Sequence, residues 1–162
     1  METFLGLQGV HWVFLGACLA AIGGGMGSAM GITYAAQVAA GIMAEDPDKF
    51  GNLIVIVALP GTQGIYGFIT AILSLILFGL LGGKAGAQVA AISGFKAFLA
   101  CLPVAFVCFV SAIYQGLTSA AAGGVVAKKP EATGKAIVLP AMVETYAVLS
   151  LIVSIFLLLA AK

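Results

Sequence analysis

Four long apolar stretches, separated by short polar connections, dominate the hydrophobic pattern of the chain. They cover about residues 10–44, 52–81, 93–127 and 136–161. A helix needs about 20 apolar residues to cross the hydrocarbon core of a bilayer, and every stretch reaches that length. The stretches are also too long, and too rich in Ala, Gly and Leu, to be strands. The pattern therefore predicts an all-α membrane protein with four transmembrane helices.

The polar connections are expected at Glu45–Gly51, Gly82–Ile92 and Lys128–Lys135. Pro47 and Pro130 lie among charged residues in the first and third connections, and a proline in this setting signals the end of a helix. An even number of spans places both termini and the middle connection on one side of the membrane. The first and third connections carry four lysines, Lys49, Lys128, Lys129 and Lys135, against Lys84, Lys96 and Lys162 on the other side. Since lysine-rich loops favour the cytoplasm, these two hairpin connections are expected there and the termini on the opposite side.

An internal repeat relates the two halves of the chain. At an offset of 83 residues, Ala17-Cys18-Leu19 matches Ala100-Cys101-Leu102, and Ser28-Ala29 matches Ser111-Ala112. After a three-residue gap the offset is 80, and Leu59-Pro60 matches Leu139-Pro140. Each half, 1–81 and 82–162, is therefore expected to form one helical hairpin. Because each hairpin has two spans, both insert in the same orientation as parallel repeats. Parallel repeats suit a ring in which every hairpin meets its neighbours in the same way.

A stripe of glycines in the first stretch predicts close helix packing. Gly23, Gly27 and Gly31 are spaced four residues apart and form two overlapping GxxxG patterns. Small residues at this spacing lie on one face of a helix, where they let two backbones approach closely in lipid. This favours a tight assembly of several hairpins.

The composition excludes a soluble enzyme, a nucleic-acid-binding protein and a disordered protein. Only 8% of the residues are charged and the mean hydropathy is +1.19, whereas soluble domains contain roughly 25% charged residues. The chain has no arginine and a net charge of +1, so it lacks the basic surface that binds nucleic acid. Cys18, Cys101 and Cys108 all lie in apolar stretches and are expected to be buried thiols rather than disulfides.

Glu144 is the one acidic residue inside the four predicted spans. It lies about nine positions into the fourth span, roughly 12–13 Å from its start at 1.5 Å per residue. A carboxylate at that depth costs several kcal/mol and indicates a functional site. Its counterpart in the first half is Gly64, so each chain has one carboxylate for two hairpins. No basic residue lies at a comparable depth, so a proton, a metal cation or a partner's base must neutralise Glu144.

Uncharged polar residues gather at a similar depth. Thr62, Gln63 and Tyr66 lie on the second span, and Gln115 lies on the third. With Glu144 they offer carboxylate, amide and hydroxyl oxygens, a set that suits an alkali or alkaline-earth cation. Proline at position 60 lacks an N–H, so it loosens the helix there and exposes backbone oxygen. The set favours sodium, with hydrogen bonding between helices as the alternative.

Several motifs carry a resemblance to a known family. They are the glycine-rich first span, Leu59-Pro60-Gly61-Thr62-Gln63-Gly64-Ile65-Tyr66-Gly67-Phe68, Gln115-Gly116, Lys128-Lys129-Pro130-Glu131 and Ala141-Met142-Val143-Glu144-Thr145-Tyr146-Ala147. With these motifs the chain resembles the proteolipid, or K-subunit, family of bacterial V-type ATPases, the duplicated c-type rotor subunits, and especially its sodium-pumping members.

The resemblance implies a set of ion-binding residues. Glu144 would be the carboxylate that binds sodium, and Leu59 would supply a backbone carbonyl. Tyr66 would hydrogen-bond Glu144 and help to hold it closed over the ion. The side-chain oxygens would come from Thr62, Gln63 and Gln115.

The resemblance also implies partners and a mechanism. Copies of the chain would form a rotor ring in the plasma membrane. A stator subunit would supply a basic residue that displaces the ion, and central-stalk subunits would bind the hairpin connections. ATP hydrolysis in a soluble head would drive rotation. This chain has no GxxxxGK[ST] motif, so it is not expected to hydrolyse ATP itself.

Three other interpretations stay open on the sequence. A proton-translocating rotor subunit of the same family would have the same fold and the same Glu144, but no cation among the amides and hydroxyls. A small four-helix exchanger of protons and organic cations would form dimers and surround its carboxylate with aromatic residues. A purely structural membrane protein would leave the deep Glu144 unexplained.

Overall fold

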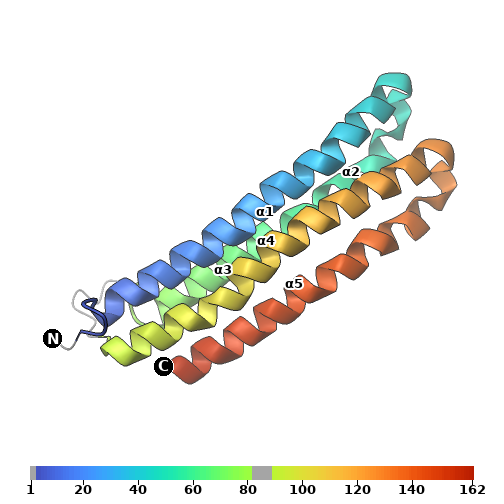
Figure 1. Ribbon diagram of the computed structural model, residues 1–162. Coiled ribbons are helices and arrows are strands. Elements are labelled where there is room, and N and C mark those ends of the chain that lie inside the picture. Colours follow the sequence, from blue (N-terminus) through green and yellow to red (C-terminus); the bar gives the residue numbers. More distant parts are fainter. Residues whose placement is uncertain (1–2, 82–88) are drawn as a thin grey trace.

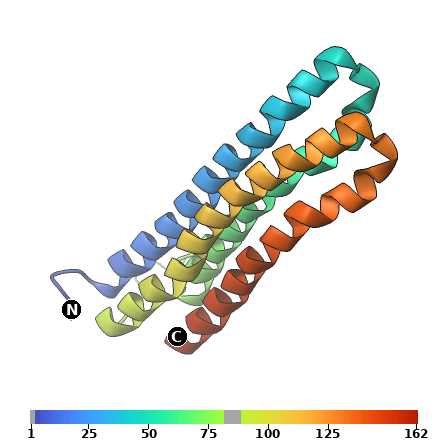
Figure 2. The same cartoon turned by 45° about the vertical axis from the view of Figure 1, so that its right-hand side comes forward.

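The computed structural model describes residues 3–81 and 89–162 as two long helical hairpins packed side by side (Figure 1). The first hairpin contains α1 (Gly9–Glu45), the 3-10 turn η1 (Pro47–Lys49), α2 (Phe50–Ala58), the 3-10 turn η2 (Leu59–Gly61) and α3 (Thr62–Leu77). The second contains α4 (Ala91–Lys128), the 3-10 turn η3 (Pro130–Ala132) and α5 (Thr133–Ala161). Both chain termini lie at the end of the bundle opposite the two hairpin turns (Figure 2).

The prediction of four spanning helices is confirmed. Within the described residues, four helical segments are long and apolar enough to cross a membrane: Gly9–Glu45, Pro47–Leu77, Ala91–Lys128 and Pro130–Ala161. Large apolar side chains cover the outside of the bundle, and Phe106 and Phe156 are 65% and 66% exposed. A surface of this kind is stable only against lipid or another apolar surface.

The second segment ends earlier than predicted, at Leu77 rather than near Leu81. Gly79 has a φ of +70°, a left-handed conformation that glycine adopts without strain. The N–H of Gly79 donates to the carbonyl of Ile76 at 3.0 Å, and the N–H of Leu80 donates to the carbonyl of Leu75 at 2.8 Å. This pair of bonds is a Schellman motif, which closes the helix and satisfies its last carbonyls. Hydropathy alone cannot detect it, because Leu80 and Leu81 prolong the apolar run. The predicted connection Gly82–Ile92 lies mostly outside the described residues, as does Lys84.

Pro60 interrupts the second segment as its missing N–H predicts. The helix changes to a 3-10 turn over Leu59–Gly61 and resumes as α3 at Thr62. The carbonyl of Leu59 then accepts from the N–H of Thr62. The backbone therefore deviates from a regular α-helix beside the predicted polar cluster.

The two hairpins meet along α1 and α4, which run side by side for most of their length (Figures 1 and 2). Glycines on α1 face the α4 backbone directly. A Cβ atom at Gly23 would collide with the carbonyl of Ala105, and one at Gly27 with the carbonyl of Phe109. A Cβ atom at Gly31 would collide with the carbonyl of Ala112, and one at Gly116 with the backbone of Gly31. The glycine stripe therefore brings two backbones into contact, as the sequence predicts, and does so within one chain.

Polar contacts join the two hairpin turns. The Lys49 ammonium donates to the carbonyl of Ala127 at 2.8 Å, and so caps the C-terminal end of α4. The side-chain amide of Asn52 donates to the Pro130 carbonyl at 3.2 Å and to the Thr133 hydroxyl at 2.9 Å. The turns of the two halves therefore lie beside each other at one end of the bundle.

The cysteines differ in exposure. Cys101 and Cys108 are buried in the core between the helices, as expected for small apolar side chains, whereas Cys18 is exposed on α1. The prediction of a buried Cys18 is therefore wrong for the single chain. An apolar stretch does not reveal which of its residues face lipid or a second molecule.

Candidate ion-binding site

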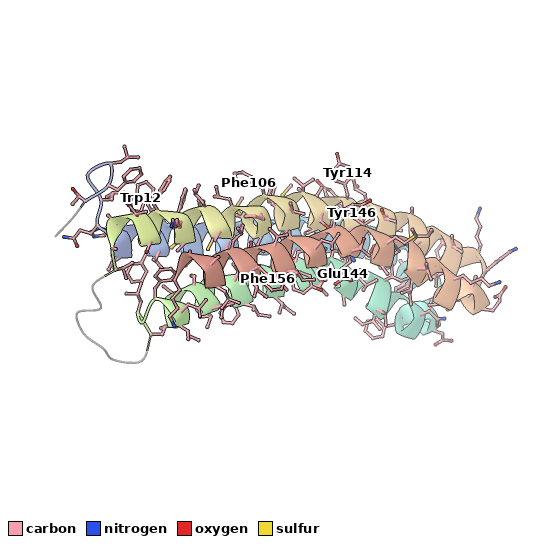
Figure 3. All side chains as sticks on the ribbon, turned by 90° about the horizontal axis from the view of Figure 1, so that it is seen from below. Trp12, Phe106, Tyr114, Glu144, Tyr146 and Phe156 are labelled. Carbon is pink, nitrogen blue, oxygen red and sulfur yellow. The ribbon has the colours of Figure 1, made fainter. Side chains whose placement is uncertain are left out.

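Glu144 lies near the middle of α5 and is partly buried between α5, α3 and α4 (Figure 3). The Tyr66 hydroxyl on α3 donates to its Oε1 at 2.6 Å. The side-chain amide of Gln115 on α4 donates to its Oε2 at 3.4 Å. Each carboxylate oxygen therefore accepts a hydrogen bond from a different helix, which fixes the direction of the side chain. Hydrogen bonds of this kind to a charged acceptor are stronger than those between neutral groups.

A chain of contacts continues from Gln115 to the 3-10 turn. The Gln63 Nε2 group donates to Gln115 Oε1. The Thr62 hydroxyl lies 3.3 Å from Gln63 Oε1 and donates to the Leu59 carbonyl at 3.0 Å. All six residues singled out from the sequence and the resemblance are therefore brought together by the fold: Leu59, Thr62, Gln63, Tyr66, Gln115 and Glu144.

The amides are held inside the chain. Gln63 and Gln115 are both 0% exposed. Burying an amide without a partner costs several kcal/mol. Here one hydrogen bond joins the two amides, while Thr62 pairs with the Gln63 oxygen and Glu144 with the Gln115 nitrogen. This arrangement rigidifies the cluster, because a rotation of either side chain would leave a buried polar atom unpaired.

Glu144 has no cationic partner among residues 3–81 and 89–162. The ion pair found in this part of the chain joins Lys49 to Asp46 at 3.3 Å, at the hairpin end. A carboxylate in a low-dielectric site is unstable when its charge is uncompensated. The charge of Glu144 must therefore be neutralised by a bound cation, a proton or a group from a partner.

Ser111 belongs to the cluster although it was not predicted as a site residue. The Ser111 hydroxyl lies 3.5 Å from Gln63 Nε2 and donates to the Val143 carbonyl at 3.1 Å, directly beside Glu144. It therefore links α4 to the turn of α5 that carries the carboxylate. The repeat contained a signal, because Ser28 and Ser111 occupy matching positions in the two halves.

The corresponding place in the first half has no carboxylate. The N–H of Gly64, the counterpart of Glu144, donates to the Ser28 hydroxyl at 2.8 Å. A Cβ atom at Gly64 would lie 3.3 Å from that hydroxyl oxygen, so α1 and α3 pack closely there. Because α1 packs directly against α3 at Gly64, a longer side chain at this position would force the two helices to shift.

The site can accept a small hard cation or a proton. Carboxylate, amide, hydroxyl and backbone carbonyl oxygens are the ligands that alkali and alkaline-earth ions prefer, and the cluster provides all four kinds. Tyr66 and the amide N–H of Gln115 hold the carboxylate in place. The backbone oxygen comes from the turn that Pro60 creates.

Two tandem hairpins with one mid-span carboxylate define a duplicated-hairpin membrane protein. The chain belongs to the ATP synthase C-subunit family, which it matches twice, over residues 15–74 and 98–157. The two matches fall one in each hairpin, in agreement with the internal repeat.

Two curated relatives are similar over most of the chain. The V-type sodium ATPase subunit K of Enterococcus hirae is 39% identical over 153 residues, which cover 94% of this chain and 94% of that protein. The A-type ATP synthase subunit K of Methanocaldococcus jannaschii is 41% identical over 151 residues, which cover 93% of this chain and 64% of that protein.

Proposed function

We propose that this chain is the rotor-ring subunit of a V-type sodium ATPase. Copies of it assemble in a ring and carry Na⁺ across the membrane while ATP hydrolysis in other subunits drives rotation. The observation that carries the proposal is the hydrogen-bonded Glu144, held at mid-span among amide and hydroxyl oxygens without a cationic partner in the described chain. The similarity to a sodium ATPase subunit K over nearly the whole chain supports the choice of ion.

In this proposal Na⁺ neutralises Glu144 and replaces part of its hydrogen-bond network. Side-chain oxygens of Thr62, Gln63 and Gln115 and the carbonyl of Leu59 complete the ligand set. Tyr66 holds the carboxylate closed over the ion through the contact at 2.6 Å. A neutral, closed site can move past lipid, because the desolvation penalty of a free carboxylate is then removed.

Release of the ion needs a partner. The chain contains no arginine, so we propose that a stator subunit supplies a basic residue that pairs with Glu144 and displaces the cation. Central-stalk subunits bind the hairpin turns, which face the cytoplasm of a cell whose plasma membrane holds the ring. Transport of one monovalent ion against 100 mV requires about 2.3 kcal/mol, which rotation must supply.

The proposal predicts that sodium protects Glu144 from carbodiimide labelling. These reagents modify a protonated carboxyl, so a bound Na⁺ that displaces the proton blocks the reaction. We expect labelling of the purified protein to fall as sodium is added, and to require more sodium as the pH is lowered. Potassium at equal ionic strength is the control. Labelling that depends on pH alone would replace the sodium proposal by a proton rotor, and an unreactive Glu144 would contradict both.

The amides provide a second test, because the proposed cation site uses their oxygens as ligands. Replacing Gln115 by Ala removes a buried partner of both Glu144 and Gln63. Loss of one interaction with a charged group is worth about 1.5–3 kcal/mol, so the sodium concentration that half-protects Glu144 should rise about 10- to 150-fold.

Ser119→Ala is the matched control for this substitution. Ser119 lies one turn further along α4, is 1% exposed, and its hydroxyl has no partner in the described chain. Its removal should leave the sodium titration unchanged. An equal sodium response in the Gln115→Ala protein and the unmodified protein would exclude Gln115 as a ligand.

A further inference from the structure

The Gln63 amide has a fixed direction in the cluster, with its nitrogen and its oxygen facing different partners. Its Nε2 group donates to Gln115 Oε1. Its Oε1 atom lies 3.3 Å from the Thr62 hydroxyl, which also contacts the Leu59 carbonyl. In the proposed function sodium is bound on the oxygen side, because Thr62 and Leu59 supply ligands there. A flipped amide would direct N–H groups at the cation, so the direction of this amide decides whether Gln63 can be a ligand.

Two acceptors face the amide nitrogen of Gln63. An amide nitrogen carries two N–H donors, and a buried donor without a partner is costly. One acceptor is Gln115 Oε1, and the other is the Ser111 hydroxyl oxygen, at a longer distance of 3.5 Å. Ser111 is 6% exposed and Gln63 is fully buried, so water has little access to this contact. The nitrogen of Gln63 is therefore placed by Gln115 and Ser111 together.

Ser111 acts as an acceptor because its single proton is used elsewhere. Its hydroxyl donates to the Val143 carbonyl at 3.1 Å, which leaves lone pairs for the Gln63 amide. A flipped amide would bring the Gln63 oxygen towards two other oxygens, Ser111 Oγ and Gln115 Oε1. Ser111 could then donate to Gln63 only after leaving the Val143 carbonyl. The bond to Val143 therefore makes Ser111 select the direction in which the amide oxygen faces the proposed ligands.

The two acceptors differ once a cation is bound. In the proposed ligand set Gln115 Oε1 binds sodium, and a cation beside this oxygen repels the positive end of a neighbouring N–H dipole. The bond from Gln63 to Gln115 is then weakened, whereas Ser111 lies outside the ligand set. We propose that Ser111 is a positioning residue of the ion site, which holds the amide nitrogen of Gln63 while the amide oxygen binds Na⁺. This inference rests on the proposed function.

The internal repeat separates this role from helix packing. Ser28, the counterpart of Ser111, is also 6% exposed, and its hydroxyl accepts from the N–H of Gly64 at 2.8 Å. Each serine therefore bonds the backbone of the second helix in its own hairpin, α3 for Ser28 and α5 for Ser111. Ser111 has in addition a contact across the hairpins, with the side chain of Gln63. Packing within a hairpin accounts for the first kind of contact and leaves the second to be explained.

The test is the sodium titration of carbodiimide labelling at Glu144 in the Ser111→Ala protein. Gln63 then loses the acceptor that does not bind the ion. The half-protecting sodium concentration should rise about 2- to 12-fold, the range expected for one neutral hydrogen bond. Labelling without sodium should keep its pH dependence, because the two hydrogen bonds to the carboxylate remain. A shifted pH dependence would mean that loss of the bond to Val143 has displaced α5, and it would overturn the proposal.

Ser150→Ala is the matched control. Ser150 is also 6% exposed, lies between α5 and α4, and donates to a backbone carbonyl, that of Ala147, at 2.7 Å. Its oxygen lies 3.7 Å from the Cys108 sulfur and not beside an amide. The sodium titration of this variant should match that of the unmodified chain. An equal rise in both serine variants would assign the effect to a general loosening between α4 and α5 and contradict the positioning role.

A double-mutant cycle tests whether Ser111 acts through Gln63. Gln63→Met keeps the length of the side chain and removes the amide. In this background Ser111→Ala should change the half-protecting sodium concentration by less than about twofold. An effect as large as in the chain with Gln63 would mean that Ser111 acts through another group, which refutes the proposal. If Ser111→Ala does not accumulate, Ser111→Cys replaces it in each measurement, because a thiol of similar shape is a weak acceptor.

The unmodified chain distinguishes failure of this inference from failure of the proposed function. Absence of sodium protection in the unmodified chain would refute the choice of cargo, and with it any role of Ser111 towards sodium. Sodium protection that is equal in the unmodified chain and in Ser111→Ala would refute the positioning role and leave the proposed function in place.

Discussion

Substituting Glu144 by Gln should reduce ATP-driven sodium uptake into vesicles to the level measured without ATP. A glutamine has nearly the same shape, and its amide oxygen can still accept the hydrogen bond from Tyr66. It cannot supply the negative charge, and a cation in a low-dielectric site is not stable without one. The ring should therefore assemble normally while the site stays empty during rotation.

Ser119→Ala is again the control, because Ser119 is buried in α4 outside the hairpin turns and its hydroxyl makes no hydrogen bond to the cluster. Its uptake should equal that of the unmodified protein. The size of the complex purified in a mild detergent reports assembly of both variants. Sodium uptake that survives in a correctly assembled Glu144→Gln ring would exclude the carboxylate as the carrier.

Replacing Gly116 by Ala should strongly destabilise the chain although it adds a single methyl group. A Cβ atom at position 116 would collide with the backbone of Gly31, including its carbonyl oxygen. Backbone cannot move aside as a flexible side chain can, so α1 and α4 must separate along the whole contact. Overpacking in a well-packed core typically costs about 1–3 kcal/mol, and a backbone collision belongs at the upper end of that range. Thermal unfolding of the purified protein in a mild detergent would measure the loss.

Gly123→Ala tests whether the loss comes from the collision or from the change of residue type. Gly123 lies two turns along the same buried face of α4, and its Cβ atom would lie 3.5 Å from Val38, an ordinary contact. Alanine favours a helix over glycine by about 1 kcal/mol, so this variant should be as stable as the unmodified chain or more so. Equal stability of the two variants would contradict the backbone contact between Gly31 and Gly116.

Hydropathy and turn chemistry were sufficient to predict the spans because a bilayer imposes a minimum apolar length on every helix that crosses it. Pro47, Pro60 and Pro130 lie at the breaks, where each lacks the N–H that a regular helix requires. Pro103 and Pro140 lie inside α4 and α5, so a proline does not by itself predict where a helix stops. The end of α3 depends instead on a left-handed Gly79. That conformation is a property of the folded turn, and it cannot be predicted from a glycine within an apolar run.

The polar site could be predicted because membrane spans contain so few polar residues. Gln63 and Gln115 stand out in their helices, and equal depth was enough to group them with Glu144 before the fold placed them in contact. The donors and acceptors could not be assigned in this way. That Ser111 contacts the Val143 carbonyl, and that Cys18 faces outward, depend on how the helices rotate about their axes. Rotation is decided by packing, which a depth estimate does not contain.

The packed Gly64 position has a mechanical consequence for a rotating ring. Its N–H is bonded to Ser28 where the other hairpin holds Glu144, so the proposed ring would carry one cargo site for every two hairpins. Each full rotation then moves half as many ions as a ring of equal size with one carboxylate in every hairpin. The free energy of ATP hydrolysis that is available for each ion doubles. The ring can therefore transport ions against twice the electrochemical gradient, at half the rate. One carboxylate for two hairpins therefore lowers the ion flow of the proposed ring and raises the gradient against which it can pump.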